Sequence, residues 1–214
     1  MNQRNWPQVF EQYLSEQMNE DAAHDLSHIR RVVHNALALA EEEGADLAVV
    51  VPAAWLHDCV VVPKDSPLRS QASKMAAETA VTFLRTQSYP AQYLEGIAHA
   101  IAAHSFSAQI LPETIEAKVV QDADRLDAIG AVGIARAFII GGALGRPIYD
   151  EADPFCQQRQ PDDFVATVDH FYTKLFKLVD TMQTTAGRRE AARRTRFMRD
   201  FLAQLGREID VIAS

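Results

Sequence analysis

Apolar residues recur every three or four positions along most of this chain, and the strict alternation typical of a half-buried strand is nearly absent. This pattern predicts an all-α protein. Between two of the expected helices, a segment rich in Gly and Pro (141–161) is expected to form a long loop, of the kind that serves as a lid or an oligomer contact. The helices are expected at 5–18, 27–43, 46–60, 68–88, 90–104, 113–123, 124–141, 162–183 and 187–211.

One of these helices, 46–60, is apolar on all its faces and yet carries the polar pair His57-Asp58 near its end. An imidazole and a carboxylate each cost several kcal/mol to bury unless something satisfies them. A divalent cation would satisfy both side chains at once. The pair therefore suggests a metal site at the end of a buried helix.

Further side chains that bind metals occur in three other segments. One His from the first of these segments, the His57-Asp58 pair and one Asp would supply two nitrogen and two oxygen donors. Such a set suits a borderline-hard cation such as Mn²⁺ or Fe²⁺ and is compatible with Zn²⁺ or Mg²⁺. Two of the histidines are five residues apart, about 140° around a helix, so they are not expected to bind one ion together. The candidates are His28; His99 and His104; and Asp122, Asp124 and Asp127.

The order of these residues resembles the HD-domain superfamily of metal-dependent phosphohydrolases. The match consists of His28, then His57-Asp58, then Asp124 within Ala-Asp-Arg-Leu-Asp. The resemblance runs from about residue 20 to the region of Glu208, which is nearly the whole chain. Longer strings resemble the small bacterial YedJ-like branch: His24-Asp25-x-x-His28-x-x-Arg31-Val, His99-Ala-Ile-Ala-Ala-His104-Ser-Phe-Ser and Gln121-Asp-Ala-Asp-Arg-Leu-Asp-Ala-Ile-Gly-Ala-Val-Gly.

The resemblance implies a specific set of metal ligands in the core of a helix bundle. These are His28, His57, Asp58 and Asp124, which would hold one divalent ion. Mn²⁺ is the first choice, and Mg²⁺, Fe²⁺, Zn²⁺, Ni²⁺ and Co²⁺ are alternatives. A structural role is expected for His99.

Two more residues are expected to manage protons or water. Branches of the superfamily that hold two metals carry extra histidines between the His-Asp pair and the last Asp. His104 matches one such place and the other falls near Ser73, which favours one metal and puts His104 beside the substrate phosphate. Asp127 shares a helix face with the ligand Asp three residues earlier. It would orient a bound water or pair with Arg125 or Arg31, and the sequence leaves both readings open.

Cationic side chains are expected to contact the substrate phosphates. Lys64 and Arg69 lie in a turn-rich loop just after the His-Asp pair, and Arg31 lies three residues after His28. Lys64 and Arg69 are equally well explained as solvated loop charges. The stringent-response hydrolases, which resemble this superfamily, carry Glu-Asp where this chain has Val61-Val62, so hydrolysis of guanosine pyrophosphates by their mechanism is not expected.

Composition restricts the partners of the protein. With 214 residues, 48% of them hydrophobic, one domain is expected over 1–214; the resemblance implies a core at about 20–140, with C-terminal helices at about 162–211 packed on it. No apolar stretch approaches a membrane span and no signal peptide is evident, so a cytoplasmic location is expected. The net charge of −8 argues against a nucleic-acid polymer as partner. A homodimer is left open. Cys59 is expected to be a small buried residue rather than a nucleophile.

The expected reaction is hydrolysis of a phosphate ester or anhydride by a metal-activated water. Asp58, His104 and Asp127 are the residues expected to act in catalysis. The resemblance suggests a nucleotide substrate, with a nucleoside triphosphate cleaved to monophosphate and pyrophosphate as the first choice. Alternatives are a phosphomonoesterase, a cyclic-nucleotide phosphodiesterase, and a non-catalytic regulatory protein that keeps the metal as a structural staple.

Overall fold

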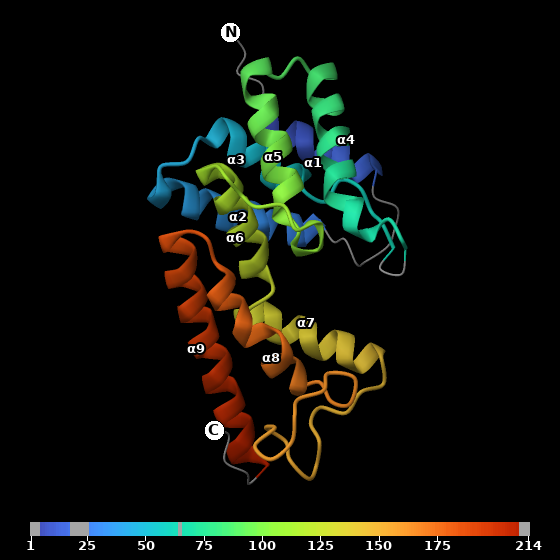
Figure 1. Ribbon diagram of the computed structural model, residues 1–214, viewed down its shortest axis with the longest axis vertical. Coiled ribbons are helices and arrows are strands. Elements are labelled where there is room, and N and C mark those ends of the chain that lie inside the picture. Colours follow the sequence, from blue (N-terminus) through green and yellow to red (C-terminus); the bar gives the residue numbers. More distant parts are fainter. Residues whose placement is uncertain (1–4, 18–25, 64–65, 210–214) are drawn as a thin grey trace. The chain divides into compact units, whose positions relative to one another are not determined.

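The computed structural model describes residues 5–17, 26–63 and 66–209, and every regular element within them is helical, which confirms the all-α prediction. Figure 1 shows the order of the elements along the chain. The elements are α1 (Trp6–Gln17), α2 (Leu26–Glu43), α3 (Leu47–Leu56), η2 (Arg69–Gln71), α4 (Ala72–Thr86), η3 (Ala91–Tyr93), α5 (Leu94–His104), η4 (Phe106–Ala108), α6 (Ile115–Asp127), α7 (Gly130–Ala143), α8 (Asp169–Thr173), η5 (Leu175–Thr181) and α9 (Thr185–Glu208).

Four of the predicted helices were wrong at their ends or along their length. The helix predicted at 46–60 ends at Leu56, so the His-Asp pair follows the helix instead of lying inside it. The boundary predicted between 123 and 124 lies after Asp127 instead, where Gly130 adopts a φ of +76° that favours glycine. The helix predicted at 162–183 is replaced by irregular chain, α8 and η5.

The described residues fall into two compact units. The first contains the chain up to Asp124 together with Gln183–Gly187, and the second contains Arg125–Met182 and the chain from Arg188 onward. The predicted packing of the C-terminal helices on the core stays a prediction.

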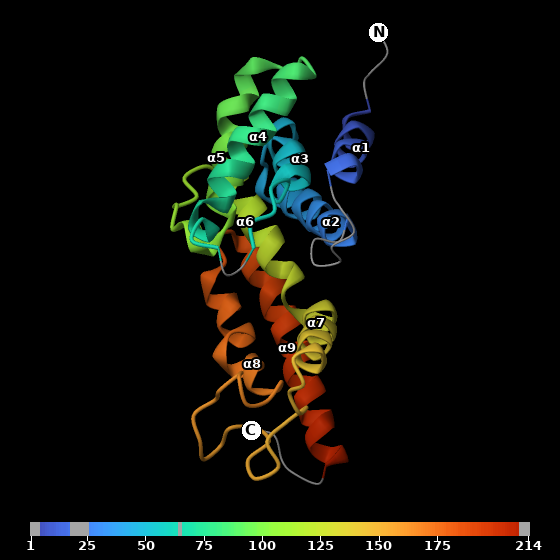
Figure 2. The same ribbon diagram turned by 90° about the vertical axis from the view of Figure 1, so that its right-hand side faces the viewer.

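The first unit is a bundle built around the apolar helix α3. This helix packs against α2 and α5, and α5 also pairs with α4, as the two neighbouring green helices in Figure 1 show. On the other side α1 contacts α3 (Figure 2). The face of α2 that repeats every three or four residues is buried: Ile29, Val32, Val33, Ala36, Leu39 and Ala40.

The first turn of α3 is fixed by two specific hydrogen bonds. Asp46 caps its start, because the carboxylate accepts from the backbone N–H of Ala48 at 2.8 Å. Pro52 inside the helix has no N–H to offer to the carbonyl of Ala48 four residues earlier. The hydroxyl of Tyr89 donates to that carbonyl instead, at 2.7 Å. The proline is thus accommodated, and α3 stays regular up to the His-Asp pair.

The second unit has an aromatic core and a long irregular segment. Phe138, Phe171 and Phe201 pack with ring centroids 5.9 to 6.3 Å apart. The chain between Ala143 and Asp169 contains no α-helix, which confirms the predicted loop. The fully buried Asp169 organises this loop, because its carboxylate accepts from the guanidinium of Arg159, with Nη2 at 2.7 Å, and from the backbone N–H of Asp162.

Within the described residues, no single helix is both long and apolar enough to cross a membrane. The consecutive helices α6 and α7 meet that criterion only when they are taken together across their break.

Candidate metal centre

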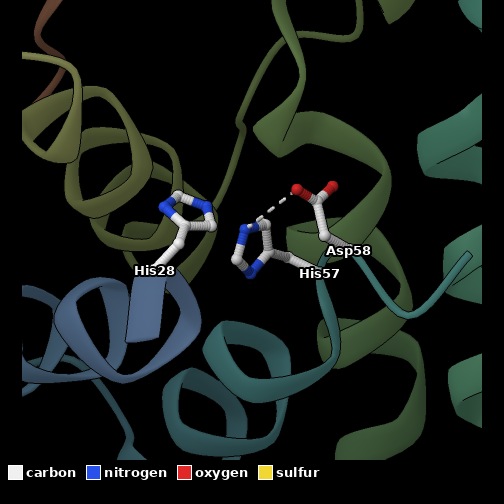
Figure 3. A group of neighbouring side chains, drawn as sticks. All are labelled: His28, His57 and Asp58. Atoms are coloured by element: carbon white, nitrogen blue, oxygen red, sulfur yellow. Dashed lines mark ion pairs between the residues drawn. The ribbon is translucent and has the colours of Figure 1, made fainter. Parts of the chain in front are cut away.

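The metal-binding residues predicted from the sequence come from three parts of the first unit. His28 lies in the first turns of α2, His57 and Asp58 follow the last residue of α3, and Asp124 lies near the end of α6. Figure 3 shows the His28 ring and the Asp58 carboxylate on either side of the His57 ring. One donor atom from each of these three side chains lies within 4.8 Å of the other two.

The Nε2 atom of His57 faces the carboxylates of Asp58 and Asp124. Its ring is fully buried, and Nδ1 lies 2.8 Å from the carbonyl oxygen of Ala54. A carbonyl can only accept, so Nδ1 carries the proton and Nε2 keeps a lone pair. Burial lowers the pKa of His57, which favours this neutral form. Among the described residues Nε2 has no hydrogen-bond partner, although it is buried.

Asp58 places one carboxylate oxygen near each of two histidines. Oδ2 lies 3.6 Å from Nε2 of His57, and Oδ1 lies 3.5 Å from Nε2 of His104. Burial on its own raises the pKa of Asp58, but electrostatic interactions with the imidazoles of His57 and His104 and a hydrogen bond to His104 outweigh it and lower the pKa. Asp58 is therefore a carboxylate at neutral pH.

Asp124 on α6 lies beside the two histidines, although it is not part of the group defined by the 4.8 Å separation. Its Oδ1 lies 3.5 Å from Nε2 of His28 and 3.9 Å from Nε2 of His57. Ligands bound about 2.1 Å from one ion lie roughly 3 to 4 Å from one another, so these separations fit a shared cation. The buried Nε2 of His57 supports the same conclusion. The residues present therefore fit a divalent ion, and their assignment as its four ligands stays a prediction.

The other two aspartates of α6 are directed elsewhere. Asp122 is fully buried and accepts from the backbone N–H groups of Gln183 and Thr184 and from the Thr184 hydroxyl. Asp127 lies in the second unit and accepts from Nη1 of Arg136 at 2.8 Å, a partner that the sequence did not indicate. A catalytic role for Asp127 stays a prediction.

The two histidines of α5 have different surroundings. His104 is buried, its Nδ1 lies 2.7 Å from the carbonyl oxygen of Ile101, and its Nε2 faces Asp58. Burial lowers its pKa, but the hydrogen bond to Asp58 and the charge of that residue outweigh it and raise the pKa. His99 accepts from the backbone N–H of Glu113 at 3.0 Å, in agreement with the structural role expected for it.

The predicted phosphate contacts are less well defined. Arg31 is half-buried on α2, three residues after His28. Arg69 donates to the carbonyl oxygen of Val62 at 3.0 Å, so it braces the loop that follows the His-Asp pair. Lys64 lies outside the described residues. Cys59 is partly buried and donates to the carbonyl oxygen of Ala76, and burial raises the pKa of its thiol to about 12, in agreement with an unreactive thiol.

Sequence reasoning missed Gln121 and Ser73 as parts of the site's support. Gln121 lies one turn before Asp124 on α6 and donates to the carbonyl oxygen of Ala103, the residue just before His104. The signal in the sequence was an amide side chain directly after the apolar pair Val119-Val120. Ser73 donates to the neighbouring carbonyl of Ala102, at 2.9 Å.

Addition of Mn²⁺ to the metal-free protein is expected to raise its melting temperature. An ion at about 100 times its dissociation constant stabilises the folded state by about 2.7 kcal/mol, or about 5 to 10 °C for a chain of this length. Differential scanning calorimetry with and without a chelator measures this shift. The variant His99→Gln should keep it, since His99 lies outside the ligand group. If none of the divalent ions raised the melting temperature, the site would not be a metal centre.

Comparison with known proteins agrees with this geometry. Residues 25–129 match the model of the HD domain family. The chain is 36% identical over 196 residues to the Bacillus subtilis protein YpgQ, covering 89% of this chain and 87% of YpgQ. The crystal structure of YpgQ in complex with ADP superposes with a TM-score of 0.70, covering 94% of this chain and 97% of that one.

A second solved structure is also similar to this chain. It is an HD-superfamily hydrolase from Bacillus thuringiensis, 34% identical, with a TM-score of 0.75 over 95% of this chain and 96% of that one. The order of the candidate ligands along the sequence, the helical fold and these matches agree, and the chain therefore belongs to the HD-domain superfamily of hydrolases.

Proposed function

We propose that the protein hydrolyses a phosphate ester or anhydride with the help of one divalent metal ion, and that its substrate is a nucleotide. The observation that carries this proposal is the buried Nε2 of His57, which faces Asp58 and Asp124 and has no hydrogen-bond partner among the described residues. A buried nitrogen of this kind is costly unless a ligand satisfies it. Two imidazoles and two carboxylates favour Mn²⁺ as that ligand.

Each residue of the site has a part in this reaction. A bound divalent ion would supply Lewis acidity, both toward a water molecule and toward a phosphoryl oxygen. The backbone carbonyl of Ala54 holds His57 in the tautomer that donates its Nε2 lone pair. His104, whose pKa is raised beside Asp58, holds a proton near the reacting group. Arg31 on α2 and Arg69 in η2 would contact the substrate phosphates.

A nucleoside triphosphate is the first candidate substrate. YpgQ has been crystallised with ADP, and its likeness to this chain extends over nearly the whole length of both. We extend the binding of a nucleotide, as in that complex, to the present chain. The YedJ-like branch within the superfamily, the cytoplasmic location and a homodimer stay predictions.

Product analysis tests the proposal. The purified protein is incubated with Mn²⁺, Mg²⁺ and other divalent ions and with nucleoside triphosphates, nucleoside monophosphates, cyclic nucleotides and p-nitrophenyl phosphate. Pyrophosphate and a nucleoside monophosphate are the expected products from a triphosphate. Release of orthophosphate alone would instead indicate a phosphomonoesterase, and opening of the cyclic nucleotides would indicate a phosphodiesterase. No hydrolysis under any condition would contradict the proposal.

A further inference from the structure

The last turn of α5 carries His104 and ends in an unusual way. The helix stops at His104, so the preceding carbonyls have no backbone N–H in the next turn to accept from. Three consecutive carbonyls are instead satisfied by side chains from three helices. Ile101 accepts from Nδ1 of His104 at 2.7 Å, Ala102 from Oγ of Ser73 at 2.9 Å, and Ala103 from Nε2 of Gln121 at 2.6 Å.

The donors from α4 and α6 are both buried. Ser73 and Gln121 are each 3% exposed, so both donor side chains are shielded from water. Gln121 belongs to the same helix as Asp124, one turn earlier, and the carbonyl it binds is directly followed by His104. Its amide thus links the helix that carries a predicted metal ligand to the helix end that carries His104.

A glutamine at this position has both a cost and a benefit. Its Oε1 is buried and has no hydrogen-bond partner among the described residues, and a buried unpaired acceptor costs about 1 to 3 kcal/mol. A methionine has nearly the same shape and would remove that acceptor, but it would leave the carbonyl of Ala103 without its donor. The specific contribution of the glutamine is therefore its Nε2 donor, which holds the carbonyl of Ala103.

We propose that Gln121 and Ser73 are positioning residues, which fix the last turn of α5 so that Nε2 of His104 stays beside Asp58. The kinetic part of this inference rests on the proposed function, since it requires His104 to act on the phosphate. The geometric part does not, because it concerns only where the His104 ring lies.

The variants Gln121→Met and Ser73→Ala test the proposal with two measurements. Displacement of His104 is expected to lower kcat about tenfold with KM nearly unchanged, because catalytic groups lose effect when they are misplaced by fractions of an ångström. Independently of activity, the ring nitrogen signals of His104 in long-range ¹H–¹⁵N spectra of the metal-free protein should move. These signals are identified by their loss in His104→Gln. If Gln121→Met does not fold, the milder Ser73→Ala carries the test.

Tyr89→Phe is the matched control. It also removes a side-chain donor from a helix carbonyl of the first unit, but at Ala48, near the start of α3 rather than at its His57 end. A loss of melting temperature with unchanged kcat and unchanged His104 signals is expected. The proposal is overturned if the Gln121 and Ser73 variants leave the signals in place, or if Tyr89→Phe moves them equally. If the wild-type protein hydrolysed no phosphate, the proposed function would fail, and the spectra would still decide the positioning role.

Discussion

Asp58→Ala is expected to abolish hydrolysis while leaving most of the fold intact. The change removes a predicted metal ligand whose oxygens face both His57 and His104. Loss of the ion's electrostatic contribution, several kcal/mol of transition-state stabilisation, corresponds to at least about a thousandfold in kcat. Product release from the best substrate with saturating Mn²⁺ measures the effect, and far-ultraviolet circular dichroism reports on the helices.

Asp46→Ala serves as the control at the other end of the same helix. Asp46 caps the start of α3, so its loss should cost about 1 kcal/mol of stability without changing kcat. Two results together would indicate that the metal has only a structural role. They are loss of folding in Asp58→Ala and a wild-type protein that hydrolyses none of the substrates.

Local sequence patterns predicted most of the helices and identified the His57-Asp58 pair as a candidate for metal binding. The buried face of α2 repeats with the helical period, and α3 is apolar throughout, so both were evident from the sequence. The His-Asp pair was conspicuous because polar groups at the end of an apolar helix need a partner. The resemblance then selected His28 and Asp124, and the structure brings both within 4 Å of a neighbouring donor.

What the sequence missed depends on contacts between distant residues and backbone groups. Gln121 binds a carbonyl 18 residues away, and backbone carbonyls carry no sequence signature. The prediction of a single helix at 162–183 was wrong for a similar reason. Side chains there bind nearby backbone: Asp162 accepts from the N–H of Phe164, and Asp169 from the N–H of Asp162, so these bonds compete with helix formation.

Substitution of Asp122 by Asn should lower the stability of the protein, whereas the same substitution of Asp124 should weaken the binding of Mn²⁺. Asp122 and Asp124 are two residues apart, which places them about 200° apart around the helix. Asp122 is buried and accepts three hydrogen bonds from Gln183 and Thr184, which also caps α9 through the N–H of Gly187. Asp122→Asn replaces one accepting oxygen with a donor, and a loss of about 2 to 3 kcal/mol is expected.

That loss corresponds to a fall of about 5 to 10 °C in the melting temperature of the metal-free protein. Asp124→Asn should leave this temperature nearly unchanged and should instead weaken Mn²⁺ binding, measured by isothermal titration calorimetry. Gly187→Ala probes the Asp122 contact from the other side, because an added Cβ would collide with Oδ2 of Asp122. Gly142→Ala, with open space around its Cβ position, is the matched control.

The comparison separates a structural carboxylate from a metal-binding one within a single helix. Because Asp122 accepts only from protein donors among the bonds described, its substitution should lower stability equally with and without Mn²⁺. Asp124→Asn should lower stability only when Mn²⁺ is present, because the variant loses the stabilisation that the bound ion provides. If Asp122→Asn weakened Mn²⁺ binding as strongly as Asp124→Asn did, the assignment of Asp124 as the ligand of α6 would have to be abandoned.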